Sequence, residues 1–300
     1  MAKIIVIFST KGGVGKSLIA TNVAVSLVKD QMKRVCIVDL DTEAVGDAAR
    51  MLDLHPQRAA VDLIGLIKKD SPNIRKEDFV LRSSVGVHFL AGALRPQQTP
   101  HLDPEKIKDV FALLDKDYDF IVVDAGKIFS DVFVAAANQA NLILLVVTPD
   151  ILSIYQTKWA LDTLQFLHLP LSMVKIVLNR AESMSGISWQ EVKANLVSDI
   201  VARLPSEGKI VGQAVNRGVA VVLDSPKSKI ALAIQFFTKD LVSGKIPFIE
   251  HTEIDKLKIK ELEPKKTGDF WQKISLICCS NKYITKNFPC INNYKIIIFI

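Results

Sequence analysis

The sequence has 300 residues, of which 49% are hydrophobic and 23% are charged. This length fits one large α/β domain or two small ones, and the composition excludes a chain that is disordered throughout. No apolar run reaches the roughly 18 residues of a membrane-spanning helix, and the apolar run at 4–8 is shorter than the core of a signal peptide. The sequence therefore predicts a soluble, cytoplasmic protein.

Apolar runs alternate with amphipathic segments along the first 250 residues. Continuous apolar runs are typical of strands that helices cover on both faces, and they occur at 3–8, 35–38, 120–123, 142–147 and 174–178. Segments with helical spacing lie between them, at 18–28, 104–116, 128–140, 153–168 and 188–197. This order predicts an α/β fold with a doubly wound, mostly parallel sheet and a ligand site at the carboxyl ends of the strands.

The net charge of +6 is concentrated near the end of the chain. Residues 251–300 contain nine lysines and five acidic residues, so the first 250 residues carry only +2. Three of the four cysteines also lie in 251–300, whereas Cys36 falls in a predicted strand and is expected to be a small core residue. We therefore expect a main domain at 1–250 and a separate basic tail, rich in Ile, Lys and Asn, that is disordered, membrane-contacting or the product of an altered reading frame.

A glycine-rich loop, Lys11-Gly-Gly-Val-Gly-Lys16-Ser17, joins the first predicted strand to the first predicted helix. Glycines in that position let backbone N–H groups turn toward phosphate oxygens, and the helix N-terminus adds partial positive charge. Lys16 would reach the β- and γ-phosphates, and the Ser17 hydroxyl would bind Mg²⁺. The loop therefore predicts a nucleotide site made by Gly12, Gly13, Val14, Gly15, Lys16, Ser17 and Leu18.

This loop departs from the general phosphate-loop pattern, because Thr10 stands where the first glycine is expected and Lys11 follows it. It resembles the deviant Walker A loop of the MinD/ParA family of ATPases, and the resemblance covers about residues 1–245. The resemblance implies a P-loop NTPase fold, ATP and Mg²⁺ as cofactors, and a homodimer that holds ATP between its subunits. It also implies that Lys11 reaches across the dimer to the partner's phosphates, so that hydrolysis depends on dimerisation.

Two predicted strands end in carboxylates on the side of the sheet where the loop lies. Val35-Cys-Ile-Val-Asp39-Leu-Asp41 carries two acids that point the same way, and Phe120-Ile-Val-Val-Asp124 has the Walker B pattern. An isolated Asp-x-Asp at a strand end is more often a turn or a cap, but the lysines of the loop favour a site. The resemblance implies that Asp41 orients or activates the attacking water, that Asp39 lies near the Mg²⁺ shell, and that Asp124 holds Mg²⁺ through water.

Two other positions bear on the resemblance. Family members often have a proline two residues after the Walker B aspartate, where this chain has Gly126. Asn179 and Arg180 close another predicted strand and resemble the family's adenine-reading segment, so we expect them at the nucleotide. On physical grounds alone, an asparagine that only forms a turn at the strand end is about as common.

Similarities outside the nucleotide motifs favour one branch of the family. Segments 90–96, 178–182, 186–188 and above all 214–228 resemble the pilus-assembly ATPases called TadZ or CpaE, which localise the machinery of a tight-adherence type IV pilus at a cell pole. Those proteins usually carry a receiver-like domain before the ATPase, whereas this chain begins at the first ATPase strand. MinD-like division-site regulators and flagellar-number ATPases therefore stay open as alternatives.

The resemblance implies a positioning switch whose partners are a second copy of the chain and the pilus secretion machinery or a polar landmark protein. A ParA-like DNA-partitioning ATPase is a second hypothesis, but a main domain with a net charge of +2 argues against nucleic acid as a partner. A nucleotide-binding scaffold without turnover is a third, although every charged catalytic position is present. Within the tail, residues 265–277 combine basic, aromatic and apolar side chains like an interfacial helix. Contact with an anionic membrane, at the inner face of the membrane or at a pole, is the location that this segment predicts.

Overall fold

The structure is a computed structural model that describes residues 1–68, 74–183 and 186–250. The chain divides into two units, Met1–Lys258 and Ile259–Ile300, and the second of these lies outside the described residues. The predicted tail at 251–300 therefore lies outside them as well. None of the helices in the described ranges combines the length and the apolar character that crossing a membrane requires.

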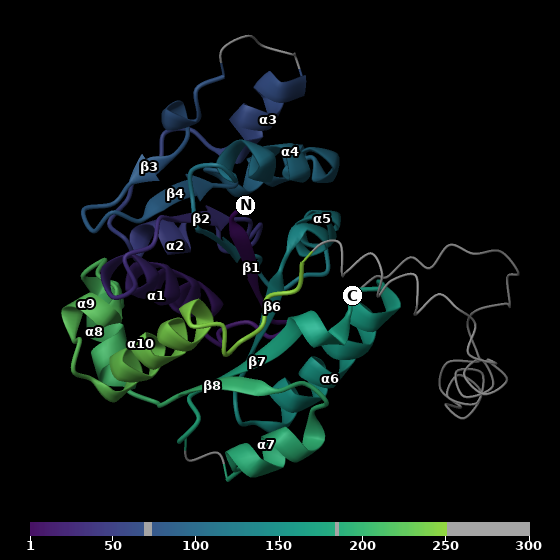
Figure 1. The fold of residues 1–300 in the computed structure, drawn as a ribbon, viewed down its shortest axis with the longest axis vertical. Coiled ribbons are helices and arrows are strands. Elements are labelled where there is room, and N and C mark those ends of the chain that lie inside the picture. Colours follow the sequence, from purple (N-terminus) through teal and green to yellow (C-terminus); the bar gives the residue numbers. More distant parts are fainter. Residues whose placement is uncertain (69–73, 184–185, 251–300) are drawn as a thin grey trace, which may run out of the picture. The chain divides into compact units, whose positions relative to one another are not determined.

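The strands of the described residues are β1 (Lys3–Phe8), β2 (Val35–Asp39), β3 (Leu81–Arg82), β4 (His88–Ala91), β5 (Phe120–Asp124), β6 (Leu142–Val147), β7 (Val174–Asn179) and β8 (Ile200–Leu204). They form one sheet in the order β3-β4-β2-β5-β1-β6-β7-β8 (Figure 1). All neighbouring strands are parallel except β3 and β4, which are antiparallel. The predicted mostly parallel, doubly wound sheet is confirmed.

The helices of the same residues are α1 (Lys16–Lys29), α2 (Asp47–Arg50), α3 (Ala60–Lys68), α4 (Pro104–Leu114), α5 (Asp131–Gln139), α6 (Ile151–Phe166), α7 (Trp189–Asn195), α8 (Gly208–Asn216), α9 (Val221–Asp224) and α10 (Lys229–Val242). Short 3₁₀ helices occur at Lys76–Asp78, Pro96–His101 and Leu171–Met173. Polar side chains cap several of the helices, and Ser188 and Glu191 form the capping box that the sequence predicts at the start of α7. The helices α4, α5, α6, α7 and α10 therefore begin where a side chain satisfies a free N–H group of the first turn.

Helices cover both faces of the sheet (Figure 1). On one face α1 contacts α10, and on the other α4 contacts α5, beside which α6 packs on β6. The central strands are buried apart from Lys3 at the start of β1, which explains why their sequences are apolar up to the aspartates that end β2 and β5. Cys36, in β2, is fully buried, as expected for a core residue. This packing fixes the carboxyl ends of β1, β2, β5, β6 and β7, and the candidate site lies in the loops that follow them.

Candidate nucleotide site

The loop between β1 and α1 has the backbone form of a phosphate cradle. Gly13 and Gly15 have φ values of +71° and +98°, which side chains rarely allow. Gly15 is the N-cap of α1 and no side chain caps that helix, so its first N–H groups remain available to a ligand. Lys16 begins α1 and is 7% exposed. The loop therefore offers backbone N–H donors and the buried Lys16 ammonium to one ligand at the start of α1.

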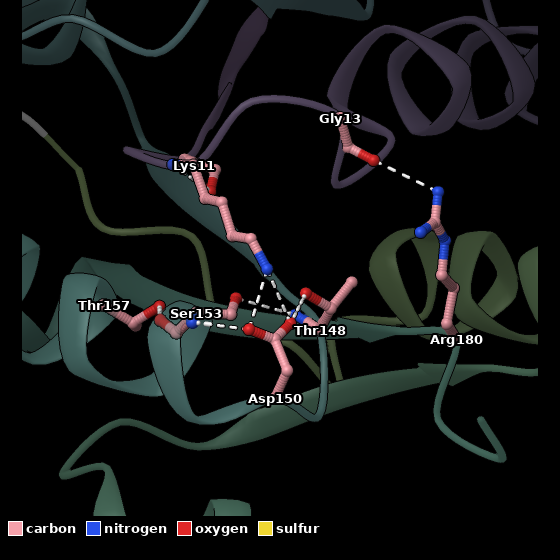
Figure 2. Close-up of polar contacts among 8 residues, drawn as sticks. Lys11, Gly13, Thr148, Asp150, Ser153, Thr157 and Arg180 are labelled. Atoms are coloured by element: carbon pink, nitrogen blue, oxygen red, sulfur yellow. Dashed lines mark hydrogen bonds and ion pairs between the residues drawn. The ribbon is translucent and has the colours of Figure 1, made fainter. Parts of the chain in front are cut away.

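Asn179 and Arg180 hold this loop from the end of β7. The Asn179 amide donates to the Val14 carbonyl oxygen at 2.7 Å. The Arg180 guanidinium donates to the Gly13 carbonyl oxygen at 3.1 Å, as Figure 2 shows. Arg180 has a left-handed backbone, with φ of 55°, and its N–H donates to the Asn179 side-chain oxygen at 2.9 Å. Two loops that lie far apart in the sequence are thus joined where the nucleotide is expected.

Asp124 is the most unusual group of the site. It ends β5, is 1% exposed, and neither of its carboxylate oxygens has a hydrogen-bond partner within the described residues. Burial raises the pKa of Asp124 to about 6 and the charge of Asp41 adds to the rise, while the Ser17 hydroxyl and the Lys16 ammonium oppose it. A buried carboxylate without partners is costly to maintain, which is typical of a group that binds a cation or its water.

Asp39 lies opposite Asp124 in the sheet, because the two residues are register partners in β2 and β5. Burial and the charge of Asp124 raise the pKa of Asp39 well above its ordinary value. One oxygen of Asp39 accepts a hydrogen bond from the Asp41 N–H at 3.1 Å. The two strand ends therefore bring carboxylates together in front of the loop, as the sequence predicts.

Asp41 is held in a turn at the start of the loop after β2. Its Oδ1 accepts hydrogen bonds from the N–H groups of Glu43 at 2.9 Å and Ala44 at 3.0 Å. Gly126 packs against it: a Cβ on Gly126 would stand 3.0 Å from the Asp41 carboxyl carbon, and the φ of Gly126 is +70°. The glycine that replaces the family's proline therefore lets the loop after β5 approach Asp41 closely.

Lys11 makes an ion pair that the sequence analysis missed. Its ammonium nitrogen lies 2.7 Å from both carboxylate oxygens of Asp150, the N-cap of α6 (Figure 2). The Thr148 hydroxyl and the Ser153 N–H donate to the same carboxylate at 2.6 and 2.9 Å. The sequence indicates Asp150 as an N-cap, since it follows an apolar run and precedes a helical segment, but that pattern does not point to Lys11.

The donor set fits Mg²⁺ better than a metal held by protein ligands alone. Within the described residues no group of three or more His, Cys, Asp and Glu side chains has the arrangement of a metal site. Mg²⁺ commonly takes one or two protein oxygens and completes its shell with water and phosphate. The unpartnered Asp124 carboxylate and the nearby Ser17 hydroxyl are such oxygens.

A family model described as an AAA domain, AAA_31, matches residues 2–172. The chain belongs to this family. The matched segment of the AAA_31 domain contains the phosphate loop, Asp39, Asp41, Asp124 and Asp150.

Two relatives of known name are similar to this chain over most of its length. The chain is 26% identical over 262 residues to the septum site-determining protein MinD of Helicobacter pylori, covering 83% of this chain and 94% of the relative. It is 26% identical over 256 residues to the antiactivator FleN of Pseudomonas aeruginosa, covering 82% and 88%. Together with the AAA_31 match, these relatives support the MinD/ParA type of ATPase that the phosphate loop predicts.

Two solved structures share its fold. One is a ParA family ATPase of Chlorobium tepidum, with a TM-score of 0.73 and 23% identity over 80% of this chain and 98% of the other. The second is MinD of Pyrococcus horikoshii, solved with Mg-ADP, with a TM-score of 0.70 and 24% identity over 82% and 98%.

The structure gathers the predicted residues of this AAA_31 domain at one edge of the sheet. Three points go beyond the sequence analysis: Asp150 binds Lys11, Asn179 and Arg180 bind the phosphate loop, and Lys127 lies against that loop. Asn179 was expected to contact the base, and that role stays a prediction.

Proposed function

We propose that this protein binds ATP with Mg²⁺, dimerises around the nucleotide, and hydrolyses ATP to ADP and phosphate. The observation that carries the proposal is the buried Asp124 carboxylate, unpartnered in the described residues, beside Ser17 in the uncapped first turn of α1. A triphosphate at this helix start would meet backbone donors and Lys16. Its metal would meet the Asp124 carboxylate and the Ser17 hydroxyl.

In this proposal Ser17 and the three aspartates have different roles. Ser17 would bind Mg²⁺ directly, and Asp124 and Asp39 would bind its water shell. When bound, the metal neutralises charge on the phosphates. Asp41, anchored by the N–H groups of Glu43 and Ala44, would orient the attacking water and accept its proton.

A second copy of the chain is the partner that the site favours. Lys11 is paired with Asp150 at the start of α6, and the Thr10 hydroxyl donates to the Gln156 carbonyl oxygen at 3.3 Å, so α6 lies beside the loop. The exposed side of α6 begins directly after Asp150 and carries five large apolar side chains, Ile151, Leu152, Tyr155, Trp159 and Phe166, beside the polar Lys158, Asp162 and Gln165. An apolar surface next to Lys11 fits burial against another copy of the same surface, as two-fold dimers require.

The nucleotide part of the proposal is tested with Lys16→Ala and Asp41→Ala. We expect Lys16→Ala to lose binding of ATP and ADP, and Asp41→Ala to bind ATP, lose turnover and accumulate as a dimer in analytical ultracentrifugation. An Asp41→Ala protein that stays monomeric at saturating ATP would refute the dimer. Turnover of the wild type equal to that of Lys16→Ala would indicate a nucleotide-binding scaffold instead.

We further propose that the ATP cycle positions a type IV (Tad) pilus assembly or secretion system, through the pilus machinery or a polar landmark protein. The support is the resemblance of 90–96 and 214–228 to TadZ and CpaE. The MinD and FleN relatives favour division-site or flagellar-number regulation as the alternative. Pilus secretion-ATPase genes beside this gene, and polar foci of a fluorescent fusion that disperse in the Lys16→Ala variant, are the expected results. Neighbouring division-inhibitor or flagellar genes would favour the alternative.

DNA partitioning is the other alternative, and the likeness to a ParA family ATPase gives it a fold-level basis. An ATP-dependent gel shift at low salt that disappears at moderate salt would support it, because phosphate contacts weaken steeply with salt. We expect no such shift, since the first 250 residues carry a net charge of only +2.

The remaining part of the proposal concerns the domains and the membrane. We propose that 1–250 is the ATPase domain and that 251–300 contacts anionic lipid weakly, placing the protein at the inner face of the membrane. The basis is the mixture of basic, aromatic and apolar residues at 265–277. Co-sedimentation of the full chain with phosphatidylglycerol vesicles should exceed that of a 1–250 truncation, and equal binding would contradict the membrane contact.

A further inference from the structure

Lys127 is a third lysine at the phosphate loop. It lies in the loop after β5, three residues beyond Asp124. Its Cδ is 3.8 Å from the point where a Cβ on Gly12 would stand, so the aliphatic part of the side chain lies against the backbone of the loop. Gly126, with its left-handed φ, precedes Lys127 and brings this loop against Asp41.

In this structure the Lys127 ammonium has an exchangeable partner. Its nitrogen lies 3.3 Å from a carboxylate oxygen of Glu43, and the two side chains are 42% and 39% exposed. Ion pairs that are this open to water contribute little to stability. A phosphate oxygen with a larger negative charge and a fixed position would compete with Glu43 successfully.

We propose that Lys127 binds the terminal phosphate of the nucleotide, exchanging Glu43 for a phosphate oxygen; this inference rests on the proposed ATP site. Asp124, three residues earlier, would hold the metal that neutralises charge on the phosphates, so the loop that carries Lys127 begins at the phosphate end of the site. Lys16, at the start of α1, would reach the β- and γ-phosphates from the helix side. The ligand class is a nucleoside triphosphate, and a diphosphate lacks the group that Lys127 would bind.

The exchange also links the nucleotide to Asp41. Glu43 follows Asp41 by two residues, and its N–H donates to the Asp41 carboxylate at 2.9 Å. When Lys127 turns to the phosphate, the Glu43 side chain loses its contact with the loop after β5. The segment that carries Asp41 then keeps the hydrogen bonds from the Asp41 N–H to the Asp39 carboxylate and from the Leu40 N–H to the Asp124 carbonyl oxygen, but it has lost this ion pair.

The test compares affinities for ATPγS and ADP, by calorimetry, in Lys127→Ala, Lys127→Arg and Lys116→Ala. Lys116 is an exposed lysine in the loop that precedes β5, whereas Lys127 lies in the loop that follows β5. The control therefore removes the same kind of side chain at the opposite end of the same strand. We expect Lys127→Ala to lower ATPγS affinity roughly tenfold and ADP affinity less than twofold, because a charge-assisted hydrogen bond is lost for one ligand only. Lys127→Arg should recover most of the loss, and Lys116→Ala should match the wild type.

The Glu43→Gln variant gives a second readout that a purely structural role would not produce. Freeing Lys127 from Glu43 should raise ATPγS affinity about two- to threefold. The same change in a Lys127→Ala background should have no effect, since the two residues are coupled.

The results separate this inference from the ATP site itself. Equal losses for ATPγS and ADP in Lys127→Ala, or affinities equal to those of Lys116→Ala, would overturn the assignment while leaving the ATP site intact. If the wild type binds neither ATPγS nor ADP, the proposed ATP site itself is refuted, and with it the role of Lys127.

Discussion

The ammonium group of Lys11 donates to both carboxylate oxygens of Asp150, each at 2.7 Å. The carboxylate is itself fixed by the Thr148 hydroxyl and by the first turn of α6. In this form of the chain, Lys11 therefore points to its own subunit. A role across a dimer requires that this pair opens.

Asp150→Asn should make ATP-dependent dimerisation easier. Asparagine keeps the N-cap of α6 but removes the charge that holds Lys11. With both side chains about one-third exposed, the pair is a weak one, so we expect the dimer dissociation constant in an Asp41→Ala background to fall roughly two- to fivefold. Sedimentation velocity at saturating ATP measures it. Dimerisation that weakens would show that Asp150 helps to build the dimer instead of restraining Lys11.

Tyr155→Ser should weaken the same dimer about tenfold, if the apolar side of α6 is buried in it. Tyr155 is 73% exposed and lies one turn after Ile151 on the same side of the helix. Phe236, on α10, is 67% exposed and gives a matched control, because Phe236→Ser removes an equally open aromatic ring elsewhere. Equal effects of the two substitutions would remove α6 from the interface.

The stability of the nucleotide-free, metal-free protein should fall as the pH rises from about 4 through 6. Folding raises the pKa of Asp124 from 3.8 to about 6, so the folded chain binds more protons than the unfolded chain in this range. The loss is about 3 kcal/mol at most, at 1.36 kcal/mol per pH unit, and the raised pKa of Asp39 acts in the same direction. Urea unfolding at pH 4.5 and 7.5 tests this.

Asp124→Asn supplies the control for that dependence. The variant should be more stable than the wild type at pH 7.5 by about 1–3 kcal/mol, because the cost of an unpaired buried charge is gone. It should also lose the stabilisation that Mg²⁺ and ATP give to the wild type. A wild-type unfolding energy that stays flat between pH 4 and 6 would contradict the raised pKa.

Gly15→Ala should abolish tight nucleotide binding. The added Cβ would stand 2.6 Å from the Asn179 amide nitrogen at a φ of +98°, so the phosphate loop must shift. Gly212→Ala, where the Cβ would meet nothing within 4 Å, should bind as the wild type does. Because Asn179→Ala removes the clash but not the backbone strain, the double variant should recover part of the affinity, measured with a fluorescent ADP analogue.

The sequence predicted the central strands well because their environment is simple. β5 and β6 are buried on both faces, so every position except the terminal Asp124 is apolar and the run is easily recognised. β4 and β8 were missed, since β4 has four residues and β8, at the sheet edge, includes the exposed Arg203. Short or half-exposed strands carry no such run.

The phosphate loop and the three aspartates were predictable because local spacing encodes them. The pair of Lys11 and Asp150 was not, as 139 residues separate the partners and no spacing rule joins them. The contacts of Asn179 and Arg180 with the loop depend in the same way on how β1 and β7 are brought together by β6.

The burial of Cys36 offers a practical route to these questions. It is the one cysteine among the described residues, and its burial in β2 raises the pKa of the thiol, which keeps it unreactive. Once the three tail cysteines are replaced by alanine, a single new cysteine at Tyr155 or Phe236 could be labelled selectively. Spin or fluorescence distances between two copies would then follow the dimer through a full round of ATP turnover.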